Sequence, residues 1–410
     1  MKVRRFIGLL LGGLLALPSL RAGVPVRDSV LEAIRPAYRP LAELFTQTPE
    51  ERPTAGNTVE IIRDGSRKLD MLVQDMMAAQ DYIHMEYFEF YRDAESRLVR
   101  KAMELKAMDS LEVRYIEEDF MNIPYPNRFF NQMRRWGVEV GHYNILHLNR
   151  RNHQKIVTID NAVAYTGGMN IGPTYFHEWD DTHIRVTGPC VPLLDQIYSV
   201  MWNRVGGNPT RADYQKTVRP VSVPEEAYRN VIVQMVSDEP DNGHEIMDSY
   251  IWLLDHCQDY LYIQTPYFTP PKAVREALKR AVARGLDVRL LIPERTDMKV
   301  VDPANRSYYK ECLEAGIRIF ESSGRFNHSK IFVADDYVSS VGSANVDGRS
   351  LKLNYENNTY FYDEAVTRDF KEYIQAGMDA SREVTLEWVE QWSACRKMGN
   401  GLARILAPQL

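Results

Sequence analysis

The chain carries one pattern of residues twice, and this internal duplication limits its fold more than any other feature. NHQKIVTIDNAVAYTGGMN in the first half matches NHSKIFVADDYVSSVGSAN in the second, which aligns His153 with His328. After each histidine, the same residue types follow at fixed spacings: Lys155 and Lys330 at +2, Asp160 and Asp335 at +7, Gly167 and Gly342 at +14, Asn170 and Asn345 at +17, and the acids Asp181 and Glu356 at +28. Two similar units in one chain predict two domains of one fold.

The repetition extends to the surrounding secondary structure. The triplet QDY at 80–82 and again at 258–260 precedes a strand-like run in each half. A helix-like pattern, a second strand, a second helix and a short strand follow each run. The apolar residues from 274 to 282 fall at i, i+3, i+4, i+7 and i+8, the spacing of one buried helix face. This alternation predicts α/β domains around largely parallel strands.

Composition supports a division into two domains. Residues 206–228 are rich in glycine and proline and weak in apolar periodicity, so they are predicted to form a linker. The first domain then covers 57–205 and the second 229–410, with an extension at 23–56 whose role the sequence does not indicate.

The four cysteines, Cys190, Cys257, Cys312 and Cys395, lack zinc-ligand spacing. They are predicted to be small buried side chains, with one or two disulfides left open if the protein is exported.

The amino terminus predicts export or membrane anchoring. Residues 1–22 join a basic start to an apolar run at 6–20, which is short for a spanning helix but suits a signal-peptide core. We therefore expect a signal peptide or an anchor, with the catalytic body on the non-cytoplasmic face of the membrane.

Residues 1–22 hold four basic residues and no acid, so the net charge of −6 becomes −6 − 4 = −10 without them. An acidic body argues against nucleic acid as the main partner.

The duplicated motif has the residue types that phosphodiester chemistry requires. On a strand, residues i and i+2 point to the same side, so each histidine projects beside its lysine. Small residues after the strand, among them Gly168 and Ser343, would let the backbone approach a ligand, and the asparagines would add neutral donors. The lysines and asparagines can hold phosphate oxygens and stabilise charge in the transition state. Two facing halves would supply each group twice.

The histidines and acids complete the predicted chemistry. One imidazole can attack phosphorus to form a phosphohistidine, while the other protonates the leaving alcohol and deprotonates the incoming one. The +28 acids would fix the histidine tautomers. A lysine beside each histidine would repel a cation, so a metal site is disfavoured. Asp160 and Asp335 lie further along the strand, and the sequence leaves a catalytic and a structural role equally open.

These motifs resemble the paired His-Lys-Asp signature of the phospholipase D superfamily. RNHQKIVTIDNAVAYTGGMNIG, WDDTHIRVTGP, GSANVDGRSLKLNYENN, IHMEYFEF, IQTPYFTPP, VVDPANRSYYKECLEAGIRIFE and LARILAPQL are similar to bacterial cardiolipin synthases, from about residue 57 to the end. The resemblance implies two pseudo-twofold-related α/β domains that share one interfacial active site. It also implies metal-independent transfer of a phosphatidyl group between phosphatidylglycerol molecules, without a cofactor, with His153 as nucleophile and His328 as general acid and base. Many such synthases begin with two membrane-spanning helices, whereas this chain has one short apolar segment.

Four functions remain to be weighed from sequence. A phosphatidyltransferase at a membrane surface is favoured, and a hydrolytic phospholipase D with water as acceptor would use the same residues. A superfamily nuclease is disfavoured by the acidic charge, and a non-catalytic scaffold by two intact motifs. Phe129, Phe130 and Trp136 lie among arginines, which suits a lipid interface or a core beside a solvated face. No obligate protein partner is evident.

Overall fold

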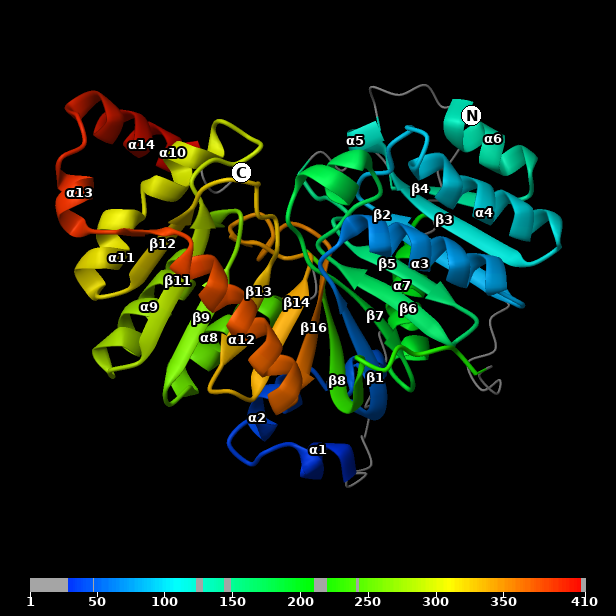
Figure 1. The fold of residues 1–410 in the computed structure, drawn as a ribbon, viewed down its shortest axis with the longest axis horizontal. Helices are drawn as coiled ribbons and strands as arrows, with labels where there is room; N and C mark the ends of the chain where they lie inside the picture. Colours follow the sequence, from blue (N-terminus) through cyan, green and yellow to red (C-terminus); the bar gives the residue numbers. More distant parts are fainter. Residues whose placement is uncertain are drawn as a thin grey trace, which may run out of the picture.

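The computed structural model describes residues 29–46, 48–122, 128–143, 149–209, 220–240 and 243–406. Two halves built from the same series of elements lie side by side (Figure 1). The first half contains β1 (Thr54–Ile62), α3 (Gly65–Ala78), β2 (Tyr82–Tyr87), α4 (Ser96–Met108), β3 (Glu112–Glu118), α5 (Asp119–Asn122), α6 (Arg128–Arg135), β4 (Glu139–Tyr143), β5 (Lys155–Ile159), β6 (Val163–Gly167), the π-helical turn η2 (Thr174–Glu178), β7 (His183–Thr187) and α7 (Val191–Arg204).

The second half repeats this series and adds a carboxyl-terminal segment. It contains β8 (Tyr228–Asp238), α8 (Glu245–His256), β9 (Tyr260–Gln264), β10 (Phe268–Thr269), α9 (Lys272–Ala283), β11 (Asp287–Pro293), α10 (Val301–Arg306), α11 (Tyr309–Ala315), β12 (Arg318–Ser322), β13 (Ile331–Ala334), β14 (Val338–Gly342), β15 (Val346–Asp347), β16 (Glu356–Tyr362) and α12 (Glu364–Asp379). After it come β17 (Arg382–Val384), α13 (Leu386–Glu390) and α14 (Ala394–Leu406).

One continuous sheet of 15 strands runs through both halves, in the order β17-β12-β11-β9-β13-β14-β16-β8-β1-β7-β6-β5-β2-β3-β4. The halves join where β1 and β8 pair antiparallel. The prediction of largely parallel strands is wrong. Within this sheet, only the runs β2-β3-β4 and β9-β11-β12 are parallel, and the other pairings are antiparallel.

Two tight hairpins explain the antiparallel centre of the sheet. β5 turns into β6 through Asp160 and Asn161, with φ of +56° and +53°, and β13 turns into β14 through Asp335 and Asp336, with φ of +49° and +55°. In each turn, the two residues with positive φ lie inside a backbone hydrogen bond, from Ala162 N–H to the carbonyl of Ile159 and from Tyr337 N–H to that of Ala334. Two successive positive φ values match the type I′ geometry, which Asn and Asp tolerate better than most residues. Helical periodicity elsewhere in the sequence carries no information about this reversal of direction.

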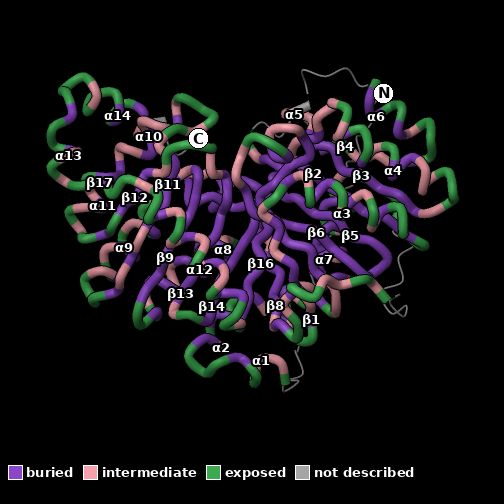
Figure 2. The backbone as a smooth tube through the Cα atoms, in the orientation of Figure 1, coloured by how far each residue is buried: buried purple, intermediate pink, exposed green. Residues whose placement is uncertain are grey.

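Helices cover both faces of the sheet. In the first half, α3 and α4 share one core with the side chains of Val157 and Ile159, while α7 packs with Ile156 in another core. In the second half, α8 and α9 pack with Phe332, and α12 packs with the neighbouring Val333. Neighbouring strand residues therefore enter opposite layers, as the pleat requires. Figure 2 shows the strands at the junction of the two halves as buried.

The extension before the first half packs on the second. Helices α1 (Ser29–Ala33) and α2 (Arg39–Leu44) precede the short 3₁₀ helix η1 (Pro49–Glu51). Leu41 and Phe45 are fully buried in the same core as α8, and Tyr38 Oη donates to Asp335 Oδ2 at 2.6 Å. Sequence patterns could not predict this contact, because it joins residues 297 positions apart.

Several further predictions concern exposure and membrane contact. Phe129 and Phe130 are buried, whereas Trp136 is 43% exposed. All four cysteines are free, and Cys395 is the exposed one, contrary to the prediction of burial. Within the described residues, no helix has the length and apolarity needed to cross a bilayer. The predicted signal peptide or anchor at 1–22 lies outside the described residues.

Candidate active site

The two motif histidines enter the site from equivalent positions at the junction of the halves. Each lies two residues before its lysine, at the start of β5 or β13. The backbone N–H of His153 donates to the carbonyl of Tyr355 at 2.9 Å, and that of His328 donates to the carbonyl of Asp180 at 2.7 Å. Both carbonyls belong to the opposite half. The position of each histidine therefore depends on the other half being docked.

The carboxylate partners also cross between the halves. His153 Nδ1 lies 2.9 Å from Glu356 Oε2, and His328 Nδ1 lies 2.7 Å from Asp181 Oδ2. Sequence analysis placed a +28 acid beside a histidine, but spacing alone cannot tell which of the two copies it serves. The structure pairs each acid with the histidine of the other copy. Neither half by itself contains a complete pair of motif histidine and +28 acid.

These contacts define the protonation of the two pairs. Burial lowers the pKa of His153 to about 4, and it also lowers the pKa of His328, with the Lys330 charge adding to the effect. Burial alone would raise the pKa of Glu356, but His153, Lys155 and the Ser343 hydroxyl together hold that pKa at about 2. At neutral pH a carboxylate therefore accepts Nδ1–H from a neutral imidazole. This tautomer leaves the Nε2 lone pair directed away from the acid.

The two lysines lie within the same buried cluster. Lys155 Nζ donates to the carbonyl of His153 at 2.7 Å, and Lys330 Nζ lies 3.0 Å from His328 Nε2. Burial lowers the pKa of Lys155 to about 7 and that of Lys330 to about 8, although acidic neighbours oppose the shift. Two ammonium groups in a desolvated cavity are poised to gain stability from an anionic ligand.

The predicted ligand-binding residues are all buried near these groups. Asn170 Nδ2 donates to Tyr175 Oη at 2.7 Å, and the Asn345 side chain is hydrogen-bonded to Asp347. Ser343 Oγ donates to Glu356 Oε2 at 2.5 Å. Gly168 leaves room for the other acid, because a Cβ there would lie 2.1 Å from an Asp181 carboxylate oxygen. Gly168 and Ser343 thus contact the acids.

Asp160 and Asp335 lie in the hairpin turns at the far ends of β5 and β13. The Asp160 carboxylate accepts backbone N–H groups of residues 80, 81 and 82 at 2.8, 2.8 and 2.9 Å. Asp335 accepts those of residues 258, 259 and 260 at 2.7, 2.9 and 3.0 Å. These residues are the repeated QDY triplets. At about 3.3 Å per strand residue, five residues place each Asp well away from its lysine.

Aromatic and acidic side chains around the two histidines were not predicted from the sequence. Phe88 packs edge-on against the His153 ring at 4.7 Å between centroids, and Trp179 lies 5.2 Å from the His328 ring. Tyr175 Oη donates to Glu89 at 2.8 Å, and burial raises the pKa of that carboxyl group. The runs EYFEF and YFHEW contain these residues, but only a fold places them at the histidines.

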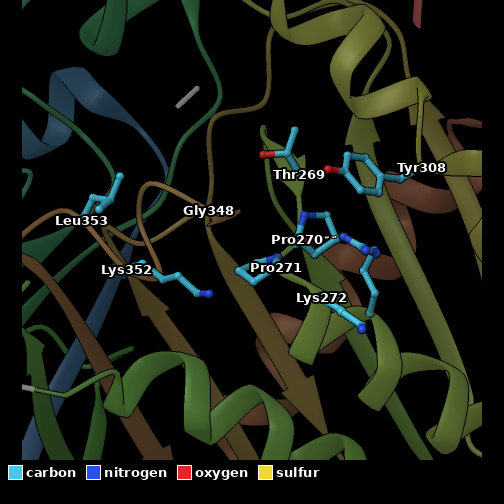
Figure 3. A pocket seen from close by; sticks show the side chains of 9 residues that line it. Thr269, Pro270, Pro271, Lys272, Tyr308, Gly348, Lys352 and Leu353 are labelled. Atoms are coloured by element: carbon cyan, nitrogen blue, oxygen red, sulfur yellow. Dashed lines mark hydrogen bonds between the residues drawn. The ribbon is translucent and has the colours of Figure 1, made fainter. Parts of the chain in front are cut away.

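A hollow of about 350 Å³ lies in the second half. It lies between the end of β10 and the loop after β15, and Figure 3 shows the side chains around it. The charge of Asp347, next to the lining residue Gly348, acts on Lys330, which links the hollow to the catalytic cluster. Its lining combines apolar walls with basic groups: Thr269, Pro270, Pro271, Lys272, Arg275, Tyr308, Gly348, Lys352 and Leu353.

Solved structures with a similar fold support the two-half architecture. Phosphatidylserine synthase from Haemophilus influenzae matches with a TM-score of 0.67 over 86% of this chain and 95% of its own, at 14% identity. Polyphosphate kinase from Porphyromonas gingivalis matches with a TM-score of 0.58 over 81% of this chain and 49% of its own, also at 14% identity. At such identities the likeness concerns the fold.

Sequence comparison identifies the family. Cardiolipin synthase from Oceanobacillus iheyensis is 31% identical over 388 residues, which cover 91% of this chain and 79% of that protein. Major cardiolipin synthase ClsA from Bacillus subtilis is 32% identical over 375 residues, with coverages of 87% and 76%. The family model described as "Cardiolipin synthase, PLD-like domain" matches residues 72–203 and 250–378, once in each half. The chain therefore belongs to the cardiolipin synthase family of phospholipase D-like proteins.

Proposed function

We propose that the chain is a phosphatidyltransferase that joins two phosphatidylglycerol molecules into cardiolipin and releases glycerol. The observation that carries the proposal is the pair of neutral imidazoles, each with Nδ1 on a buried carboxylate from the opposite half. This arrangement leaves two Nε2 atoms for one phosphodiester. The similarity to cardiolipin synthases supports the choice of lipid.

The first half-reaction breaks the bond between phosphorus and the glycerol headgroup. His153 Nε2 attacks phosphorus, and His328 donates a proton to the departing glycerol oxygen. Lys155 and Lys330 balance the charge on the non-bridging oxygens. No described side chain hydrogen-bonds His153 Nε2, whereas His328 Nε2 contacts Lys330, and this difference favours His153 as nucleophile. An anionic lipid also raises the pKa of His328 toward the protonated form that the step requires.

The second half-reaction restores the enzyme. A headgroup hydroxyl of a second phosphatidylglycerol gives its proton to His328 and attacks phosphorus as the bond to His153 breaks. We place this acceptor in the hollow of the second half, whose lining joins Lys272 and Lys352 to Pro270, Pro271 and Leu353, a combination suited to a lipid phosphate and its glycerol. The predicted residues Asn170 and Asn345 stay in the proposal as donors near phosphate, while Gly168 and Ser343 position the acids.

The proposed partner is an anionic phospholipid at a membrane surface, without nucleic acid, metal or cofactor. The catalytic body would lie on the non-cytoplasmic face of a bacterial envelope membrane. The basic start and apolar run of residues 1–22 support this location.

The test is incubation of the purified protein with phosphatidylglycerol vesicles, with and without chelator, followed by mass spectrometry. His153→Ala and His328→Ala should each abolish cardiolipin and glycerol, and His256→Ala, at an exposed histidine, should not. An alkaline quench should trap the phosphatidyl group on the peptide that contains His153. Phosphatidic acid without cardiolipin would instead make the enzyme a hydrolase, and the absence of any lipid product would reject a lipid substrate.

A further inference from the structure

Helix α14 presents its apolar side to solvent. Met398, Leu402 and Ile405, spaced i, i+4 and i+7, are 65%, 60% and 73% exposed. The positions between them that face the protein include Asn400 and Ala403, both buried. A surface helix of a soluble protein normally turns its apolar stripe inward. An outward apolar stripe of this kind marks a surface that contacts something apolar.

The polar face of α14 fixes this orientation. Arg404 donates to the carbonyl of Ser307 and forms an ion pair with Glu311. Lys397 Nζ donates to the carbonyl of Glu390 at 2.6 Å, and the Arg396 guanidinium lies 4.2 Å from the Trp392 ring. Turning the helix by half a turn would break all of these contacts. The apolar stripe is therefore held outward by the fold.

The stripe lies at the edge of the sheet where the site opens. The carboxyl ends of the parallel strands β9 and β11 and the amino end of β13 share this edge, because Ile331 pairs with Gln264 and Leu291 with Gln264. The motif residue Lys330 directly precedes Ile331. Helix α10 follows β11, and α14 packs against α10 (Figure 1). Helix α14 and the catalytic groups thus lie at the same edge of the second half.

Two other exposed apolar side chains lie at the corresponding edges of the two halves. Met298 is 46% exposed and follows Asp297, whose charge acts on His328 and Lys330. In the first half, Phe120 is 41% exposed at the carboxyl end of β3, the equivalent edge. α14 also holds three basic residues and no acidic one, in a chain of net charge −6. All three lie on the side of α14 opposite the stripe, where Arg404 pairs with Glu311, so the stripe itself is apolar and uncharged, as insertion among lipids requires.

We infer that α14 lies in the interfacial layer of a bilayer rich in anionic phospholipid, with Met398, Leu402 and Ile405 among the lipids and the active site turned toward them. The contact surface is defined by the residues of this helix. The direction of the site toward its substrate rests on the proposed lipid function. The contact itself does not, and it can be measured without turnover.

Cys395 offers a direct probe of this contact. It is exposed on the apolar side of α14, while the other three cysteines are buried, so a thiol-reactive, polarity-sensitive fluorophore would label it alone. Phosphatidylglycerol vesicles should shift the emission to the blue. The control is Leu98→Cys in a Cys395→Ser background, because Leu98 is 52% exposed on α4 and should not shift. An equal shift at both positions, or none at Cys395, overturns the inference.

A variant provides the second readout. Met398→Ser with Leu402→Ser and Ile405→Ser should weaken binding to these vesicles by about 100-fold and slow turnover on them, with unchanged turnover on monomeric short-chain phosphatidylglycerol. Leu98→Ser with Met108→Ser, at positions on α4 that are 52% and 53% exposed, is the control and should change neither.

The outcomes separate this inference from the proposed function. A blue shift without cardiolipin production would leave the membrane contact standing and reject the synthase. Cardiolipin production without a blue shift would support the synthase and reject the membrane contact of α14. A shift that needs only a higher protein concentration and no lipid would assign the stripe to self-association, and would overturn the inference.

Discussion

Asp160→Asn separates a structural from a catalytic role for the third residue of the motif. Asparagine tolerates the φ of +56° at this position, so the hairpin turn can be kept while the charge and one acceptor are lost. The carboxylate accepts three backbone N–H groups and is 7% exposed, so water can replace little of what is removed. The substitution therefore tests the bonds to the QDY triplet with little other change.

The expected loss can be worked from these three bonds. Two of them would persist with a neutral acceptor, which costs about 1 kcal/mol each relative to a charged one. The third would set the amide N–H₂ of the new side chain against a backbone N–H and cost about 1–3 kcal/mol. The free energy of unfolding should fall by about 3–5 kcal/mol. The turnover number of the folded protein should stay within about threefold.

The assay pairs urea unfolding with initial rates of lipid transfer, measured at a temperature where the variant is folded. Asp335→Asn should behave in the same way because its bonds to residues 258–260 repeat the arrangement. Asp181→Asn is the opposite control, since it removes the partner of His328 and should reduce turnover by far more than it reduces stability. The reasoning is refuted if Asp160→Asn loses over about 100-fold in turnover with its stability unchanged.

Three further outcomes follow from the site. Glu356→Gln should lower kcat by about 10²–10⁴-fold, because the amide cannot stabilise the imidazolium; a loss under about tenfold in steady-state rates would contradict this. The ratio kcat/KM should fall as the pH rises through about 7 to 8. Burial lowers the pKa of Lys155 and Lys330 to those values, and deprotonation removes the charge that binds phosphate. A pH profile that stays level to about pH 9.5 would disprove this prediction. Lys272→Ala with Lys352→Ala should raise KM for phosphatidylglycerol about 3–10-fold at constant kcat, and a fall in kcat with no change in KM would reject the hollow as a binding site.

How far the sequence predicts this protein depends on whether a feature is local. The duplicated spacing predicted two α/β units, and the period-two pattern placed His153 beside Lys155. The prediction of strand direction was wrong, because the direction is decided by the hairpin turns at Asp160 and Asp335 and not by apolar periodicity. These same turns explain why the QDY triplets recur, since each triplet supplies the three N–H groups that one aspartate accepts.

The crossing of the acid partners was beyond sequence reasoning for a different reason. A +28 acid exists in each copy, and the spacing is the same whichever histidine it serves. The choice depends on how the two halves dock, through contacts such as Asn357 Nδ2 to Thr166 Oγ1 at 2.6 Å and Thr182 Oγ1 to Ser329 Oγ at 3.0 Å. These are polar contacts between segments about 150–190 residues apart, and no local pattern marks them.

The two halves are not chemically equal, and their differences suit a reaction with two distinct steps. In the first copy, Gly168 contacts the shorter acid Asp181, and a side chain at Gly168 would collide with that carboxylate. In the second copy, Ser343 occupies the equivalent position beside the longer acid Glu356, and its hydroxyl donates a hydrogen bond to that acid. Glu356 thus gains an extra donor and stabilises a negative charge behind His153, while Asp181 shares its histidine with Lys330. In the proposed mechanism, this unequal support would let His153 act as the nucleophile while His328 carries the proton.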